Sequence, residues 1–214
     1  MHHWRTLQWA SWLGWQIDSN WARSEEVVKT VPELVRLAAR GESSVRLAAL
    51  DVLGRLQPPD IVAILAPLAL SEDADVARGA IRAMRHVTDP AIDGHLDALS
   101  RASDEWRRVE AITASAQRGG PNAIAALEWV AAADESAAVA ESAIDGLAAI
   151  ATRAPRDGAA GADATRALVA LTAEPSRRDA AVTALARLPW HASPTSPAAW
   201  NTRRRRSAAR SSKR

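Results

Sequence analysis

The fold is decided by a short stretch that recurs along the chain, beginning with residues 45–54, which read VRLAALDVLG. An alanine inside this stretch recurs at intervals of 31, 31, 32 and 38 residues, as Ala49, Ala80, Ala111, Ala143 and Ala181. A fixed period in this range is typical of a solenoid built from pairs of helices.

Two further columns of apolar residues support the same period. One precedes the alanines by about fifteen residues and marks the first helix of each pair: Leu34, Leu65, Leu96, Leu127 and Leu168. The other follows each alanine directly: Leu50, Ile81, Ile112, Ile144 and Val182. A single pair cannot bury its apolar face alone, so only stacking closes a core. The sequence therefore predicts an all-α fold, an α-solenoid of about five helical hairpins with an extra N-terminal helix.

Turn residues separate the helix pairs, and changes in composition divide the chain into three parts. Stop signals at Pro58-Pro59-Asp60 and Asp89-Pro90 separate neighbouring pairs, as helix boundaries should. We expect a Trp-rich segment at 1–22, the solenoid at 23–189 and an Arg/Ser/Pro-rich disordered tail at 190–214. Within the solenoid, Pro and Gly residues predict a flexible insertion at about 152–163.

Residues 45–54 resemble the second helix of a bacterial HEAT repeat, of the type also found in phycobilisome-lyase-like (PBS-lyase) proteins. Residues 76–84 are a weaker copy, and residues 139–147 are another copy without the arginine. The resemblance covers about residues 26–188 and implies an armadillo-type fold. Such repeats serve mostly as binding scaffolds, and fold does not imply function.

Composition excludes several classes of protein. The sequence contains no cysteine, which removes disulfides, thiolate metal sites and cysteine nucleophiles. We find no apolar run long enough to span a membrane and no secretory signal. The sequence therefore predicts a cytoplasmic protein.

The basic charge belongs to the end of the chain. The whole sequence carries a formal net charge of +2, and residues 201–214 hold six Arg and one Lys, so the remainder carries 2 − 7 = −5. Arginines that neutralise phosphates would suit a nucleic acid. No basic stripe continues into the repeats, which argues against a nucleic-acid partner.

A change of reading frame would account for this tail. Residues 190–214, written in GC-rich codons and shifted by one register, can read as another helix pair about one period after Ala181. We hypothesise that a frameshift or truncation converted a sixth repeat into the tail. The array would then end without a polar cap, which favours self-association near Leu168, Leu171, Val182 and Leu185.

Five of the nine tryptophans stand near the beginning of the chain: Trp4, Trp9, Trp12, Trp15 and Trp21. They do not share one helical face. One interpretation is a capping helix over the first repeat. The other is peripheral contact with the inner membrane, because tryptophan prefers the headgroup layer.

The segment from Trp4 to Trp21 also resembles the cytoplasmic opening of some bacterial ABC-transporter permeases. The resemblance covers about twenty residues, and the membrane spans that would follow in a permease are missing. It implies a role beside a transport system.

Because solenoid proteins bind partners on their concave surface, we expect the binding face on the surface lined by the second helices. Six arginines lie on or beside these helices and would receive a protein partner with an acidic segment: Arg46, Arg78, Arg82, Arg85, Arg107 and Arg108. Asp51, Glu141 and Asp145 would make the far end negative. The alternative is a solvated face whose charges pair within their own helices.

Catalytic patterns are sparse, and we predict no catalytic residues, no metal site and no cofactor. We expect His95 to be a buried or half-buried structural residue, because it shares a column with Ile64. His86 lies near a helix end. Trp106 and Trp129 are expected to pack between neighbouring units.

The sequence therefore favours a non-enzymatic protein–protein interaction scaffold. The first alternative is an accessory protein of a membrane transport system, recruited by the Trp-rich start. The second is a lyase-like or nucleic-acid-processing HEAT protein, which rests on family analogy alone.

Overall fold

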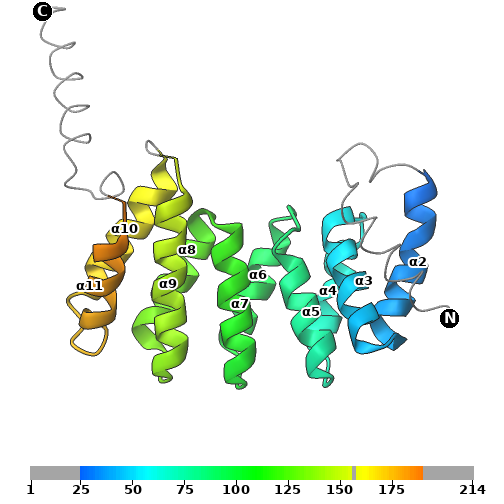
Figure 1. Cartoon of the computed structure of the whole chain (residues 1–214), viewed down its shortest axis with the longest axis horizontal. Helices are drawn as coiled ribbons and strands as arrows, with labels where there is room; N and C mark the ends of the chain where they lie inside the picture. The colour runs from blue at the N-terminus through cyan, green and yellow to red at the C-terminus, as the bar shows by residue number, and fades with distance from the viewer. Residues whose placement is uncertain (1–24, 156–157, 190–214) are drawn as a thin grey trace, which may run out of the picture. The chain divides into compact units, whose positions relative to one another are not determined.

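The computed structural model describes residues 25–155 and 158–189, and every regular element in these ranges is an α-helix (Figure 1). The helices are α2 (Glu25–Arg40), α3 (Ser43–Leu56), α4 (Ile61–Ala69), α5 (Ala74–Met84), α6 (Ala91–Leu99), α7 (Glu105–Arg118), α8 (Gly120–Ala133), α9 (Ala137–Arg153), α10 (Ala159–Leu171) and α11 (Arg178–Arg187). The predicted N-terminal helix, the five early tryptophans and the tail lie outside the described residues.

The chain divides into two compact units, with the boundary between Ala114 and Ser115 inside α7. In the first unit, α2 packs on α3 and α4 packs on α5, which makes two hairpins. The hairpins stack through like helices, because α3 contacts α5 and α4 contacts α6.

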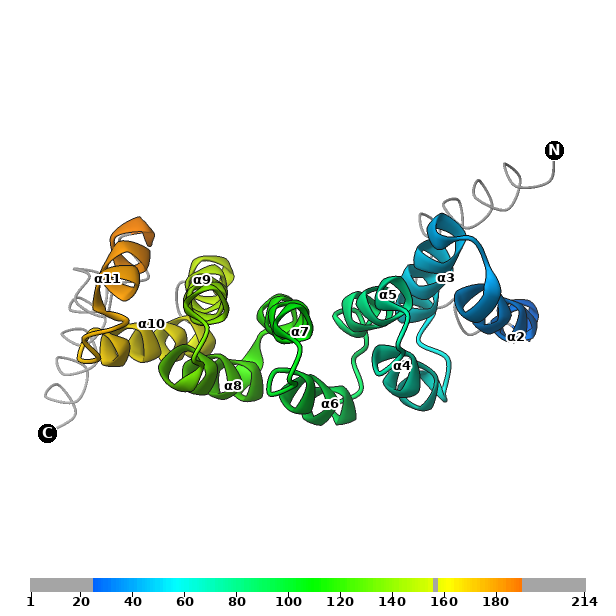
Figure 2. The same cartoon turned by 90° about the horizontal axis from the view of Figure 1, so that it is seen from below.

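The second unit repeats this arrangement. Helix α8 pairs with α9 and α10 pairs with α11, while α8 contacts α10 and α9 contacts α11. Figure 2 shows the resulting layers in each unit: α3 and α5 lie on the opposite side from α4, and α9 and α11 lie on the opposite side from α8. The predicted α-solenoid of about five helical hairpins is confirmed.

The core consists of the columns that the sequence predicts. All five alanines of the first column and all five leucines of the second are buried, with at most 1% of their surface exposed. Of the residues that follow the alanines, Leu50, Ile81, Ile112 and Ile144 are buried too. Val182 is the exception and is 50% exposed. It stands on α11, the last helix of the described residues.

Local capping explains several helix boundaries. The Asp73 carboxylate accepts hydrogen bonds from the backbone N–H groups of Asp75 and Val76 and so begins α5. Ser136 caps α9 in the same way. These caps satisfy donors that have no partner inside the helix. Helix α3 ends at Leu56 and is followed by its C-cap Gln57, whose φ of 49° places it in the left-handed region.

The predicted insertion at 152–163 is shorter in the structure. Helix α9 continues through Arg153 and α10 begins at Ala159, so only residues 154–158 separate the two helices. The reason is that the alanine-rich stretch after Gly158 outweighs the single glycine inside it, Gly161, which packs closely on Ala154. Among the described helices, none combines the length and the apolar character that a membrane crossing needs.

Candidate binding surface

All six predicted arginines lie in the first unit, on helices α3, α5 and α7 or at their ends. Arg46 is on α3, Arg78 and Arg82 are on α5, and Arg85 is the C-cap of α5. Arg107 and Arg108 stand in the first turn of α7. Each contacts an oxygen atom elsewhere in the unit, and the contacts sort the six residues into three groups.

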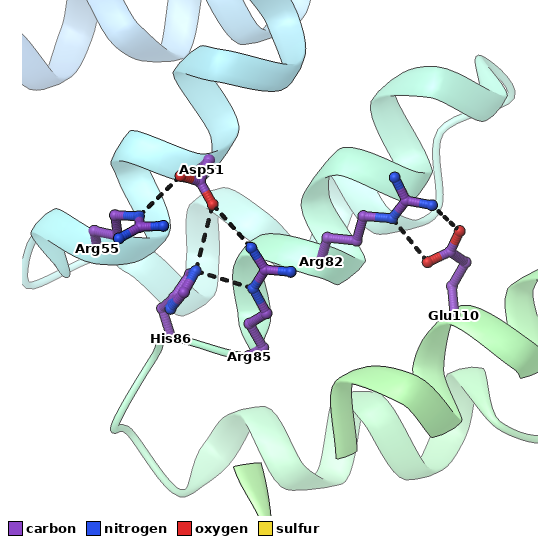
Figure 3. Close-up of polar contacts among 6 residues, drawn as sticks. All are labelled: Asp51, Arg55, Arg82, Arg85, His86 and Glu110. Atoms are coloured by element: carbon purple, nitrogen blue, oxygen red, sulfur yellow. Dashed lines mark hydrogen bonds and ion pairs between the residues drawn. The ribbon is translucent and has the colours of Figure 1, made fainter. Parts of the chain in front are cut away.

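Arg78 and Arg82 share the carboxylate of Glu110, which reaches toward them from α7. Arg82 donates from Nε at 2.9 Å and from Nη2 at 2.6 Å, a bidentate pair that Figure 3 shows joining α5 to α7. Arg78 Nε lies 4.0 Å from the same carboxylate. The hydrogen bond with Glu110 raises the pKa of Arg82 above its usual range.

Trp106 lies one turn before Glu110 and is flanked by two guanidinium groups. The centre of the Arg78 guanidinium is 5.0 Å from the ring centroid, and that of Arg107 is 4.8 Å away. Both distances are within the range of a cation–π contact. Trp106 is half-buried and packs against the core, as the sequence predicts.

An open depression of about 710 Å³ lies beside this cluster. Its lining comes from α5, from the turn before α7 and from the first two turns of α7: Arg78, Arg82, Ser103, Asp104, Glu105, Trp106, Val109 and Glu110. The depression therefore brings two of the six predicted arginines together with the half-buried tryptophan.

Arg85 belongs to a second group, which Figure 3 shows around Asp51. Arg85 donates from Nη2 to Asp51 at 3.2 Å and from Nε to His86 Nε2 at 2.9 Å. Arg55 donates to the other oxygen of Asp51 at 2.8 Å. Asp51 therefore pairs with two arginines of its own unit and does not serve as the negative end that the sequence predicts.

His86 Nε2 accepts the hydrogen bond from Arg85 Nε, as a neutral imidazole does. Burial is the main cause that lowers its pKa, and the positive charge of Arg85 lowers it further. The carboxylate of Asp51, 3.3 Å from Nε2, opposes both effects only in part. Protonation of His86 would add a third cation around one carboxylate.

The third group binds oxygen atoms of the loops between helices and consists of Arg46, Arg107 and Arg108. Arg46 Nη1 lies 2.9 Å from Asp73, the cap of α5. Arg107 donates to the carbonyl oxygen of Ser71 in the preceding hairpin at 2.6 Å. Arg108 donates to the carbonyl oxygens of Ala102 and Ser103. These three guanidinium groups are therefore engaged in polar contacts within the unit.

The sequence interpretation of charges pairing within their own helices describes only part of this surface. Arg55 with Asp51 is such a pair, but Arg82 with Glu110, Arg85 with Asp51 and Arg46 with Asp73 join different hairpins. Glu110 was missed as a member of the site. Opposite charges about one period apart, 28 residues for Arg82 and Glu110, are the signal that identifies it.

Two other predictions about single residues are wrong. His95 is exposed on α6 because that helix is short and its buried side is already filled by Ile92, Leu96 and Leu99. Trp129, which the sequence places between neighbouring units, is 45% exposed on α8. Among the described residues, no three His, Asp or Glu side chains gather as a metal site requires.

The fold defines a class, the helical-hairpin repeat proteins, and comparison with known proteins adds little beyond it. No family model matches the sequence, and no curated protein does. Among solved structures, human deoxyhypusine hydroxylase in complex with glycerol shares 17% identity over 85% of this chain and 78% of its own, with a TM-score of 0.40. An engineered protein shares 23% identity over 84% of this chain and 88% of its own, with a TM-score of 0.45.

Proposed function

We propose that the chain is a non-enzymatic protein–protein interaction scaffold whose partner binds on the second helices of the first unit. The observation that supports this most is the exposure of Arg78 and Arg82, whose side chains are 42% and 55% exposed although both contact Glu110. Their shared carboxylate is only 15% exposed. Taken together, Arg78, Arg82 and Glu110 therefore present a positive accessible charge.

A second reason is that the surface is held in place before a partner arrives. Contacts between hairpins, such as Arg46 with Asp73 and Arg107 with the carbonyl of Ser71, fix the second helices against one another. A surface ordered in advance loses less conformational entropy on binding. A partner that presents an acidic segment suits it best.

Site-specific photo-crosslinking tests this proposal. A photoreactive amino acid would replace Thr113, exposed on α7, or Ala63, exposed on α4. We expect one identified protein to be crosslinked from position 113 and not from position 63, and to bind the purified chain. Equal crosslinking from both positions, or no purified protein that binds, contradicts the scaffold.

Recruitment to a membrane transport system is the second candidate, because five tryptophans fall within residues 1–22. Tryptophan favours the interfacial layer of a bilayer. Flotation of the full chain and of a chain lacking residues 1–22 with liposomes tests it. We expect only the full chain to float, and equal behaviour of the two removes the candidate.

A further inference from the structure

The junction between α5 and α7 carries a charged residue where the neighbouring repeats carry small ones. Glu110 stands 31 residues after Gly79 and 62 after Ala48 in the repeat register. At Gly79, an added Cβ would lie 2.6 Å from Leu50 Cδ1, so α5 lies tightly on α3. Glu110 has a long side chain at this position and meets Arg78 and Arg82 instead.

The hydrogen bonds of Arg82 with Glu110 determine which of its N–H donors remain for a ligand. Arg82 uses Nε and Nη2 for Glu110, which leaves the Nη1 donors for a ligand, on a side chain that is 55% exposed. Arg78, one turn earlier, lies over Trp106. Two guanidinium groups whose orientation is fixed in this way suit one further carboxylate, since such charge-assisted hydrogen bonds are the stronger ones.

Two of the residues that line the depression are apolar. Trp106 and Val109 are both half-buried and both line the depression. A volume of about 710 Å³ accepts a few side chains of an extended segment. An apolar side chain next to the carboxylate would therefore cover Trp106 and Val109.

The rim limits how acidic this segment is. Asp104 is engaged by Arg107 at 2.7 Å, whereas Glu105 is exposed at the edge of the depression. A run of several acids would place its further carboxylates near Glu105, and like charges repel. The site thus selects a single acid among apolar residues over a polyacidic tract.

We propose that the depression between α5 and α7 binds an extended partner segment in which one Asp or Glu lies between apolar residues. The carboxylate binds Arg78 and Arg82, and a neighbouring apolar side chain packs on Trp106 and Val109. This inference rests on the proposed scaffold function and names the partner chemistry of the same site.

Fluorescence polarisation with the full chain and three labelled peptides tests the proposal. The probes are Gly-Ser-Leu-Glu-Leu-Ser-Gly, the same peptide with Gln in place of Glu, and Gly-Ser-Glu-Glu-Glu-Ser-Gly. We expect the first peptide to bind about tenfold more tightly than the Gln peptide, because Gln cannot form the charge-assisted hydrogen bond that Glu forms. The polyacidic peptide should bind more weakly than the first.

Matched variants locate the binding. Arg82→Ala should weaken the first peptide about tenfold, and Arg82→Lys, which keeps the charge, should weaken it less. Arg36→Ala on α2 removes an exposed arginine paired within its own helix and should leave binding unchanged. Thermal melts followed by circular dichroism verify that each variant is folded.

Equal binding of the Glu and Gln peptides, or equal binding by the Arg82→Ala and Arg36→Ala variants, overturns the proposal. If a partner is still crosslinked from position 113 in that case, the scaffold function stands and only the site and its ligand chemistry are wrong. If neither peptide nor partner binds, both are wrong.

Discussion

Two junctions of the first unit, α3 with α5 and α5 with α7, occupy equivalent places in the repeat and are built differently. The first is tight, since Gly79 lies against Leu50 and an added Cβ at Gly54 would lie 2.5 Å from the carbonyl oxygen of Ala83. The second, the polar junction, is joined by Glu110 with two arginines and borders an open depression.

The comparison teaches how a repeat gains a distinctive surface without losing its fold. The buried columns are the same at both junctions, because Leu50, Ile81 and Ile112 are all buried. The residues beside these columns differ. A long charged side chain in place of glycine or alanine converts a closed junction into one with accessible polar groups.

Removing a buried leucine from the tight junction should have the largest effect. Leu50→Ala should lower the free energy of unfolding by about 2–5 kcal/mol, because it leaves a cavity where Leu50 is fully buried. Val109→Ala, at the half-buried position of the polar junction, should cost less than about 1 kcal/mol. Urea unfolding followed by circular dichroism measures both, and equal losses would erase the contrast between the junctions.

Adding one methyl group should distinguish three glycines. Gly54→Ala should cost about 1–3 kcal/mol, since the backbone carbonyl of Ala83 cannot move aside. Gly79→Ala should cost less, because the atoms it meets are the ends of two leucine side chains.

Gly94→Ala on α6 is the matched control for these two variants. A Cβ there meets nothing within 4 Å, and alanine should stabilise the helix by about 0.5–1 kcal/mol. The same urea midpoints report all three variants. A Gly54→Ala protein as stable as the Gly94→Ala protein would mean that α3 and α5 lie further apart than the structure places them.

The polar junction should contribute a small coupling energy that depends on salt. A double-mutant cycle of Arg82→Ala and Glu110→Ala should give about 1 kcal/mol between the two residues, the upper range for an exposed ion pair. The coupling should decrease in 1 M salt, because salt screens exposed charges. A zero coupling at low salt would show that the pair does not hold α5 to α7.

Protonation of His86 should give the smallest effect. Its pKa lies below its ordinary value of 6.5 when folded, so the unfolded chain binds a proton there first. The stability of the protein therefore falls as the pH drops through about 6.5, whereas above that pH the residue is neutral in both states and contributes nothing.

The measurement is the urea midpoint between about pH 7.5 and about pH 5.5. The decrease should be smaller for His86→Gln than for the unchanged protein. His95→Gln, which alters an exposed histidine of α6, should keep the full decrease. Identical slopes for all three proteins would show that Asp51 offsets burial completely.

The fold was predictable because burial repeats along the sequence. Ala49 and Leu65 belong to columns whose members are buried in every hairpin, so the period alone identifies them. Val182 belongs to such a column and is exposed nonetheless, because a column gives only the average burial of its members. His95 was mistaken for the same reason, since a column gives an average orientation.

The site was predictable only in part, because its geometry depends on pairs. The sequence identified Arg78 and Arg82 from their type and helix. It did not identify Glu110 as their shared partner, nor the carbonyl of Ser71 as the acceptor for Arg107. A backbone carbonyl carries no sequence signal, whereas the glutamate did carry one in its distance from Arg82.

The side-chain contacts between successive turns have a consequence for how such a chain changes length. Gln57 accepts hydrogen bonds from the N–H and hydroxyl of Thr88, 31 residues later, and Ser43 donates to Asp75, 32 residues later. Duplication of one whole hairpin supplies both halves of such a contact again. An insertion of a few residues separates the halves, so growth of this protein by evolution or by design proceeds in steps of one hairpin.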